Sequence, residues 1–356
     1  MKTPAQSAVQ AIQGKAVGVN IVTNDEPGGT PTIRVRGLGT IIAGRDPLYV
    51  IDGVETQGLN GLSPNEIATM DILKDAASLA IYGQRGANGV VIISTKKGKE
   101  GKPKVSIDSY YGIKQIQRDV KMADSQRFAY YNNYSLGQPG YFSEAQPNNT
   151  NWLDEITTTG EVISNYFSVA GGSENVNYYF GMTHYEEKGI LQGTEFKRIN
   201  LNSRNDYSIL DKRVKITQNF NVTINRATPK PLSAFTNAYK QSPIVPVYFE
   251  NGRYGVPLRN ATTGLIDING SDRFNNVGNP VAQLNNTFNE NKGVILFGSV
   301  GAEWKIIDNL KFNSTFGATY ETYQGWSLNN GLENYLATNA TRNLADFEAS
   351  FGPNPI

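Results

Sequence analysis

Few side chains in this chain of 356 residues could carry catalysis, and they do not form a catalytic set. The chain has no cysteine, which excludes thiol catalysis and metal sites built from cysteine. His184 is the only histidine, and no serine and aspartate partners can be argued for it. We interpret it as a polar residue near the end of a strand. The sequence therefore predicts that the protein is not an enzyme.

Two kinds of loop could be mistaken for cofactor or metal sites. The glycines at 28–29 and 37–39 lack the spacing and the following helix of a dinucleotide or phosphate loop, so we interpret them as turn residues. Residues 267–272 (DINGSD) suggest calcium, but an EF-hand loop has glycine sixth and glutamate twelfth. Here glycine is fourth and the twelfth residue is Gly278. We expect no cofactor, with weak calcium binding in outer loops as an open alternative.

The composition is typical of β structure rich in turns. Glycine reaches 36 residues, tyrosine (19) outnumbers phenylalanine (15), and only 18% of the residues are charged. The net charge is +1, and no basic patch is interleaved with aromatic residues. Nucleic acid is therefore not an expected partner. The longest apolar runs, such as residues 90–93, are far too short for a membrane helix.

From about residue 104 onward, the chain alternates apolar and polar residues over long segments. In the clearest segment, residues 214–224, apolar side chains fill most even positions, and lysine, threonine and asparagine fill the odd ones. Seven strands are predicted, at about 104–116, 161–171, 175–187, 195–208, 213–226, 293–306 and 310–322. Strands of about 12 residues exceed the usual length in soluble sheets and suit a tilted membrane span.

The connections between these strands differ in length in a regular way. Tight turns are predicted at 172–174, 210–212 and 308–309, and longer connections at 117–160, 188–194 and 227–292. Outer-membrane barrels have short periplasmic turns and long extracellular loops. If the first strand rises outward, every tight turn falls on the periplasmic side, with extracellular loops at 117–160 and 227–292. This pattern favours a transmembrane β-barrel, with a soluble β-sandwich as the alternative.

The first 98 residues have a different, mixed α/β texture. We predict a helix over 8–16 and strands at 17–22, 32–36, 48–51 and 89–95. Ser63 to Glu66 form a capping box with proline at the first helical position, so a short helix should follow. Residues 70–73 could continue this helix or form a strand. A charged, glycine-containing linker at 99–103 separates the domain from the strands at 104–356.

Several motifs in this first region resemble the plug domain of TonB-dependent receptors. Residues 33–37 (IRVRG) are similar to a plug strand, and residues 46–54 (DPLYVIDGV) closely match the family's "PLYVIDGV" signature. Residues 72–77 (ILKDAA) and 81–90 (IYGQRGANGV) look like a further stretch that is specific to the SusC/RagA branch. The resemblance covers nearly all of residues 8–99. It implies a plug domain at 1–98 followed by a partial outer-membrane barrel.

The resemblance also implies parts that this sequence does not show. The family has a barrel of about 22 strands around the plug. It also has a signal peptide, a small additional N-terminal domain and a TonB-binding segment. Seven strands cannot close a barrel, and an open edge would leave backbone groups unpaired in lipid. We therefore expect the chain to be part of a longer protein that would not transport anything by itself.

What the resemblance implies about function is nutrient import across the outer membrane of a Gram-negative-type bacterium. The implied partners are TonB, a SusD-like surface lipoprotein, outer-membrane lipid and a glycan or peptide substrate. Plug arginines of the family are thought to pair with barrel carboxylates, a role that we transfer to Arg36 and Arg85. Trp152 and Trp326, expected in loops, are predicted ligand contacts. The alternative is a non-transporting surface binding or adhesion protein with a β-sandwich body.

Overall fold

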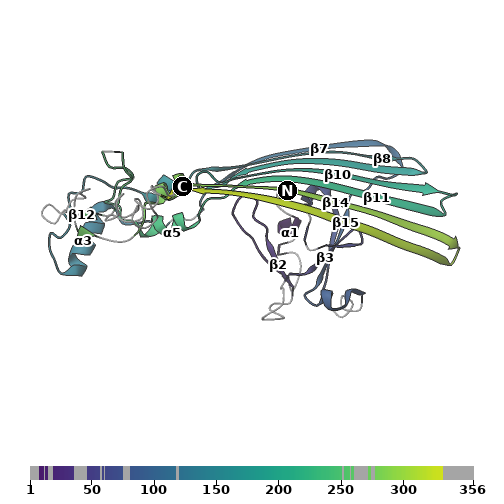
Figure 1. The fold of residues 1–356 in the computed structure, drawn as a ribbon, viewed down its shortest axis with the longest axis horizontal. Helices are drawn as coiled ribbons and strands as arrows, with labels where there is room; N and C mark the ends of the chain where they lie inside the picture. The colour runs from purple at the N-terminus through teal and green to yellow at the C-terminus, as the bar shows by residue number, and fades with distance from the viewer. Residues whose placement is uncertain are drawn as a thin grey trace.

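The computed structural model describes residues 8–331, except 12, 15–18, 36–45, 57, 60, 75–80, 118–119, 251, 257, 260–271 and 274–276. Its described residues form an N-terminal domain and one large sheet that arches over this domain (Figure 1). Within them, no helix has the length and apolar character needed to cross a membrane.

The N-terminal domain is built on a four-stranded sheet in the order β4-β3-β6-β5. Its strands are β3 (Leu48–Ile51), β4 (Val54–Thr56), β5 (Ile67–Leu73) and β6 (Val90–Thr95). β3 and β6 are parallel and central, which explains why both are nearly continuous apolar runs. The described part of the domain also contains a hairpin of β1 (Val19–Val22) and β2 (Thr32–Val35), the helix α1 (Ala8–Ala11) and the 3-10 turn η2 (Gly83–Gly86).

The predicted capping box is present, but the helix after it is a single turn. Ser63 caps the 3-10 turn η1 (Pro64–Glu66), and the Glu66 side chain accepts a hydrogen bond from the Ser63 backbone in return. The chain then enters β5 directly, because Ile67 to Leu73 pair with β6. Of the two interpretations left open for residues 70–73, the strand is the correct one.

All seven predicted long strands are present, and they form one antiparallel sheet, called the wall below. They are β7 (Gly101–Lys114), β8 (Gly160–Gly172), β9 (Val176–Lys188), β10 (Glu195–Ile209), β11 (Val214–Thr228), β14 (Thr287–Ile307) and β15 (Leu310–Asn329). Each strand pairs with its neighbour in sequence order. The last two strands are longer than predicted. β7 begins at Gly101, so most of the linker predicted at 99–103 belongs to the first strand.

The long connections carry short elements of their own. The segment between β7 and β8 contains α3 (Ser125–Leu136) and α4 (Trp152–Ile156). The segment between β11 and β14 contains α5 (Ser233–Lys240), the short strands β12 (Leu258–Arg259) and β13 (Asp272–Arg273), and α6 (Pro280–Asn285). These helices gather beyond one end of the wall, and the tight turns lie at the other end (Figure 1).

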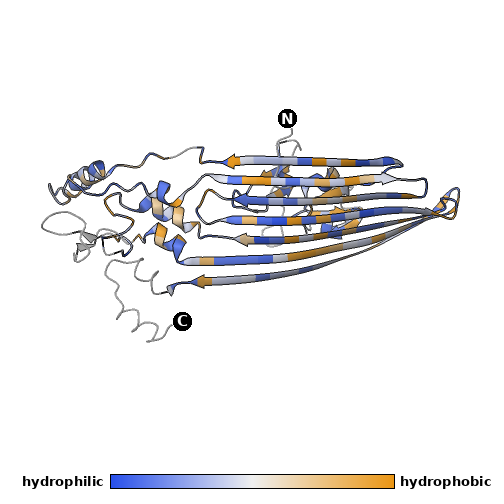
Figure 2. Ribbon diagram, turned by 90° about the horizontal axis from the view of Figure 1, so that it is seen from above, coloured by the Kyte–Doolittle hydropathy of each residue, from blue (hydrophilic) through white to orange (hydrophobic). Residues whose placement is uncertain are grey.

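The wall has an apolar convex face and a polar concave face. Apolar and polar residues alternate along each strand (Figure 2), and the apolar set is open to the surroundings: Ile107 is 74% exposed and Phe316 is 75% exposed. The polar set faces the N-terminal domain, where Asn202 and Asn221 are buried. In the described residues, the alternating apolar side chains therefore do not meet across two stacked sheets. The β-sandwich alternative is wrong for this architecture.

Candidate functional site at the interface of the N-terminal domain and the wall

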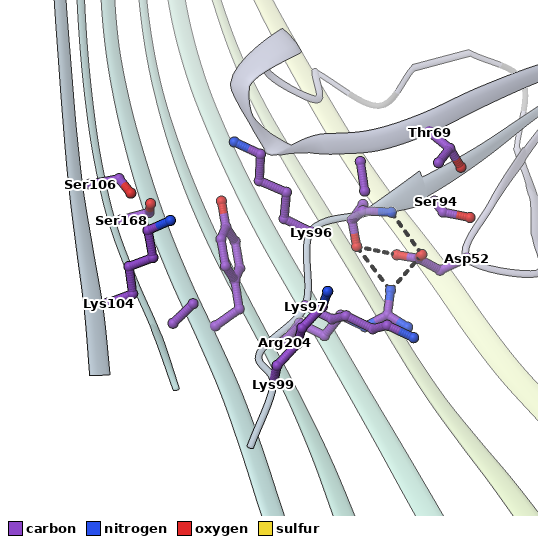
Figure 3. Close-up of a pocket in the computed structure, with 14 residues that line it drawn as sticks. Asp52, Thr69, Ser94, Lys96, Lys97, Lys99, Lys104, Ser106, Ser168 and Arg204 are labelled. Atoms are coloured by element: carbon purple, nitrogen blue, oxygen red, sulfur yellow. Dashed lines mark hydrogen bonds and ion pairs between the residues drawn. The ribbon is translucent and has the colours of Figure 1, made fainter. Parts of the chain in front are cut away.

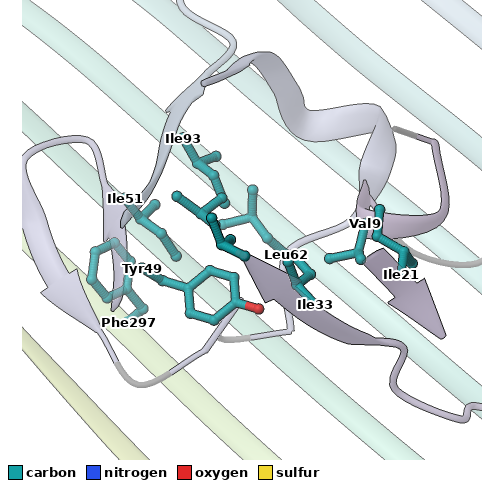
Figure 4. Packing of buried hydrophobic residues seen from close by; sticks show 10 residues of the cluster. Val9, Ile21, Ile33, Tyr49, Ile51, Leu62, Ile93 and Phe297 are labelled. Carbon is teal, nitrogen blue, oxygen red and sulfur yellow. The ribbon is translucent and has the colours of Figure 1, made fainter. Parts of the chain in front are cut away.

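The wall completes the apolar core of the N-terminal domain. Phe297 of β14 is fully buried among domain residues such as Tyr49 and Ile51 (Figure 4). Elsewhere, the domain and the wall approach each other closely because a small residue lies at the contact. A Cβ at Gly317 of β15 would lie 2.5 Å from Val54 of β4. The domain is therefore seated on the concave face by direct packing.

A carboxylate of the N-terminal domain is held by groups of both the domain and the wall. Asp52 accepts hydrogen bonds from the backbone and hydroxyl of Thr95 at 3.0 and 2.6 Å. It also accepts from Arg204 Nη1 of β10 at 2.5 Å and from Asn219 Nδ2 of β11 at 2.7 Å. Arg204 Nη1 is also 3.0 Å from the Thr95 hydroxyl (Figure 3). These four residues are called the Asp52 latch below.

Local structure explains how the latch is positioned. Asp52 directly follows β3 at a tight turn and has a φ of 48°, a left-handed conformation that aspartate tolerates better than most residues. Gly53, with a φ of 87°, completes the turn into β4. On the wall, Arg204 and Asn219 are directly opposite each other in the β10–β11 register. Two neighbouring donors on one sheet face therefore meet one carboxylate.

Glu66 is a second, more deeply buried carboxylate at this interface. Its Oε2 accepts hydrogen bonds from the Ser63 backbone and from Asn221 Nδ2 of β11, each at 3.2 Å. Its Oε1 has no partner among the described residues. Next to it, the Thr183 hydroxyl of β9 donates to the Ser63 hydroxyl at 3.1 Å. Burial raises the pKa of Glu66 to about 7, although Ser63, Arg198, Asn221 and Lys96 act in the opposite direction.

This raised pKa predicts that stability depends on pH. Since folded Glu66 keeps its proton up to about pH 7, whereas an unfolded chain releases it near pH 4.5, the folded state binds more protons between these values. Stability should therefore fall by about 3 kcal/mol as pH rises through this window and level off above it. Calorimetry of the purified protein from pH 4.5 to 8 tests this.

The matched variants for this test are Glu66→Gln and Glu100→Gln. Glu66→Gln keeps a neutral side chain of nearly the same shape. The part of the pH dependence of the unfolding temperature that Glu66 causes between pH 4.5 and 7 should therefore be mostly absent in this variant. The second removes an exposed carboxylate near the junction of domain and wall and should retain that change. Identical pH profiles for the wild type and Glu66→Gln would contradict the prediction.

A third contact lies toward the helical end of the wall. The backbone N–H of Gly28 donates to Glu187 Oε2 of β9 at 3.2 Å. Glu187 is fully buried, accepts from the Tyr185 hydroxyl at 2.9 Å and pairs with Lys114. Gly28 has a φ of 71°, and a Cβ there would lie 2.2 Å from the Phe196 ring of β10. Glycine is therefore required at this contact.

The four residues predicted for the site have different outcomes. Arg36 lies outside the described residues. Arg85 is exposed and pairs with Glu55 of β4, so its ionic partner belongs to the same domain and not to the wall. Trp152 is buried in a helical cluster, with its indole N–H donating to the Ser242 carbonyl at 2.8 Å. This packing corrects the expectation that it lies free in a loop to contact a ligand.

Trp326 does not lie in a loop either, because β15 continues to Asn329. Thr319 is opposite Phe297, which points at the N-terminal domain, and residues two apart along a strand share a face. Trp326, at an even position, therefore lies on the convex face and is 57% exposed. The ligand contact predicted for it would require the opposite face. Of the suggested calcium loop at 267–272, residues 267–271 lie outside the described residues, and Asp272 begins β13.

The resemblance led us to expect arginines on the N-terminal domain and carboxylates on the wall, and the interface has the opposite arrangement. The domain supplies the carboxylates of Asp52 and Glu66, and the wall supplies Arg204 and, near Glu66, Arg198. The sequence did carry a usable signal: Asp52 lies in the DPLYVIDGV motif, and Arg204 lies at a polar position of an alternating strand. From the sequence alone, the motif indicated the family resemblance but not the partner of Asp52.

Comparisons with known proteins agree with this architecture. Residues 1–90 match the family model described as the TonB-dependent Receptor Plug Domain. The chain is 32% identical over 340 residues to TonB-dependent receptor P3 of Formosa agariphila, covering 90% of the chain and 31% of that protein. It is 31% identical over 345 residues to TonB-dependent receptor SusC of Bacteroides thetaiotaomicron, covering 88% of the chain and 33% of SusC.

The chain belongs to the SusC/RagA-type TonB-dependent receptors. The fold is similar to that of the solved RagAB peptide transporter, with a TM-score of 0.74 at 19% identity, covering 92% of the chain and 40% of the solved one. The chain thus spans about a third of the length of the curated relatives it matches. In this receptor, the N-terminal domain is the plug.

Proposed function

We propose that the chain is the plug and the first seven wall strands of an outer-membrane transporter that imports large nutrients such as glycans or peptides. The observation that carries the proposal is the Asp52 latch, which joins a plug turn to two wall strands. The full-length receptor, meaning this chain together with the strands that close the barrel, would carry out the import. In this proposal, the latch holds the plug in place until TonB pulls it.

The interface has the properties that a detachable plug requires. Several of its buried polar atoms have no hydrogen-bond partner among the described residues: Glu66 Oε1, Arg198 Nε, Asn200 Oδ1, Asn202 Nδ2 and Oδ1, and Asn219 Oδ1. A buried polar group without a partner costs about 1–3 kcal/mol, which water can recover when the plug leaves. A mostly polar wall face therefore lowers the work needed to release the plug. TonB would supply this work mechanically.

We further propose that a SusD-like lipoprotein covers the helical end of the wall. The helices α3 to α6 gather at the end opposite the tight turns, which would face outward in an outer-membrane barrel (Figure 1). The likeness to the RagAB peptide transporter supports this arrangement by its fold.

Two measurements on the full-length receptor test the proposed function. In detergent, an outer-membrane barrel should migrate faster on a gel before heating than after it, because the closed sheet stays compact. Deleting the receptor gene should abolish growth on one glycan or peptide source and leave growth on a monosaccharide unchanged. Equal mobility with and without heat, or normal growth of the deletion strain on all such sources, would contradict the proposal.

A further inference from the structure

A cavity of about 530 Å³ lies between the plug and the concave face of the wall, toward the tight turns. Five cationic side chains line it, those of Lys96, Lys97, Lys99, Lys104 and Arg204 (Figure 3). Among the described residues that line it, Asp52 is the single carboxylate, and the latch already joins it to Arg204. None of the four lysines forms an ion pair with a described residue. The cavity, called the basic pocket below, therefore has a strong excess of positive charge.

The backbone that carries the lysines is positioned by the fold and is not a free tail. Gly98, between Lys97 and Lys99, is buried, and a Cβ there would lie 2.3 Å from the Tyr178 carbonyl oxygen of β9. The chain therefore passes directly against the wall at this point, and only glycine allows this approach. Lys96 lies over the Tyr166 ring, with its Nζ 4.9 Å from the ring centre.

The pocket belongs to the interior of the receptor and not to its lipid surface. Lys104 and Ser106 of β7 are opposite Ala170 and Ser168 of β8, on the face that meets the plug. The lipid-facing positions of β7 are the alternate ones, such as the exposed Ile107. A lipid headgroup is therefore not the expected occupant, whereas a nutrient passing between plug and wall would reach the pocket.

The lining indicates which chemistry this occupant has. Ammonium groups form their strongest hydrogen bonds with oxyanions, and the hydroxyls of Thr69, Ser94, Ser106 and Ser168 can donate or accept further bonds. Among the described residues, the lining has no leucine, isoleucine, valine, methionine or phenylalanine, the side chains that would receive apolar residues of a peptide. We propose that the basic pocket binds acidic oligosaccharides, through carboxylate or sulfate groups, as they pass the plug.

The binding proposal rests on the proposed function in one respect only, that the bound oligosaccharide is a nutrient being imported. Binding itself can be measured on purified receptor. The experiment is isothermal titration of full-length receptor in non-ionic detergent at low salt, with tetragalacturonic acid as the probe. Neutral galactotetraose and hexaglutamate are the comparison ligands. The test variant carries Lys97→Gln, Lys99→Gln and Lys104→Gln. The matched control, Lys102→Gln, Lys212→Gln and Lys311→Gln, loses the same charge near the same end of the wall, outside the pocket lining.

Wild-type receptor and the control variant should bind tetragalacturonic acid, and the test variant should bind it at least about five-fold more weakly. Any of four results would overturn the proposal: no binding by the wild type, equal binding of galactotetraose, tighter binding of hexaglutamate, or unchanged affinity of the test variant. If binding behaves as expected but the deletion strain imports every nutrient normally, the proposed function fails and the binding site stands. If the strain loses uptake of a nutrient but the probe does not bind, the reverse holds.

Discussion

A disulfide between Ser63→Cys and Thr183→Cys should stop uptake by the full-length receptor, and a reductant should restore it. Ser63 belongs to the plug and Thr183 to β9, and their hydroxyl oxygens are 3.1 Å apart, so two thiols at these positions would be in contact. No other cysteine within this chain competes for either thiol. If import requires the plug to leave this part of the wall, the oxidised variant should import no more than the deletion strain.

The control variants distinguish a plug locked by the disulfide from a receptor damaged by the substitutions. Each single cysteine variant should import normally, since it removes only one hydroxyl contact. A second double variant, Ser109→Cys with Asn165→Cys, would join two wall strands whose side chains are 2.7 Å apart, without tying the plug. It should import normally even when oxidised. Full uptake by the oxidised Ser63–Thr183 variant, with the disulfide confirmed by mass spectrometry, would show that this part of the plug stays docked during import.

The wall could be predicted from sequence because its physics is local. Alternation along a strand separates an apolar face from a polar one, and the seven strands and their faces follow from it. The bounds were less predictable: β14 begins at Thr287, although Thr287 to Lys292 look like a polar loop. These residues pair with β15, and cross-strand pairing is not visible in either strand alone.

The site was less predictable because it joins segments far apart in the chain. Asp52 meets Arg204 across about 150 residues, and no local pattern selects that partner among the arginines of the chain. Arg85 resembled a plug–barrel contact by family analogy, yet Glu55 lies closer. Trp152 looked like a loop residue because α4 has only five residues, and its burial depends on α5 and α6 packing against it.

Asp52→Asn should loosen the plug. Asparagine keeps the size of the side chain but leaves the Arg204 guanidinium, only 14% exposed, without its counter-charge. Removing one partner of a buried ion pair typically costs about 3–5 kcal/mol. In cells that make the variant, we expect increased sensitivity to a bulky antibiotic such as vancomycin, which an intact outer membrane excludes. The purified receptor should show an earlier unfolding transition of the plug.

A second substitution distinguishes loss of the ion pair from general damage at Asp52. In the double variant Asp52→Asn with Arg204→Met, neither charge remains buried, so much of the lost stability and of the antibiotic exclusion should return. Glu161→Gln is the surface control: it breaks the exposed pair with Lys188, whose charges are already well solvated, and should change neither readout. If the double variant were as leaky as Asp52→Asn, the hydrogen bonds from Asp52 to Thr95 and Asn219, and not the charge pair, would hold the plug.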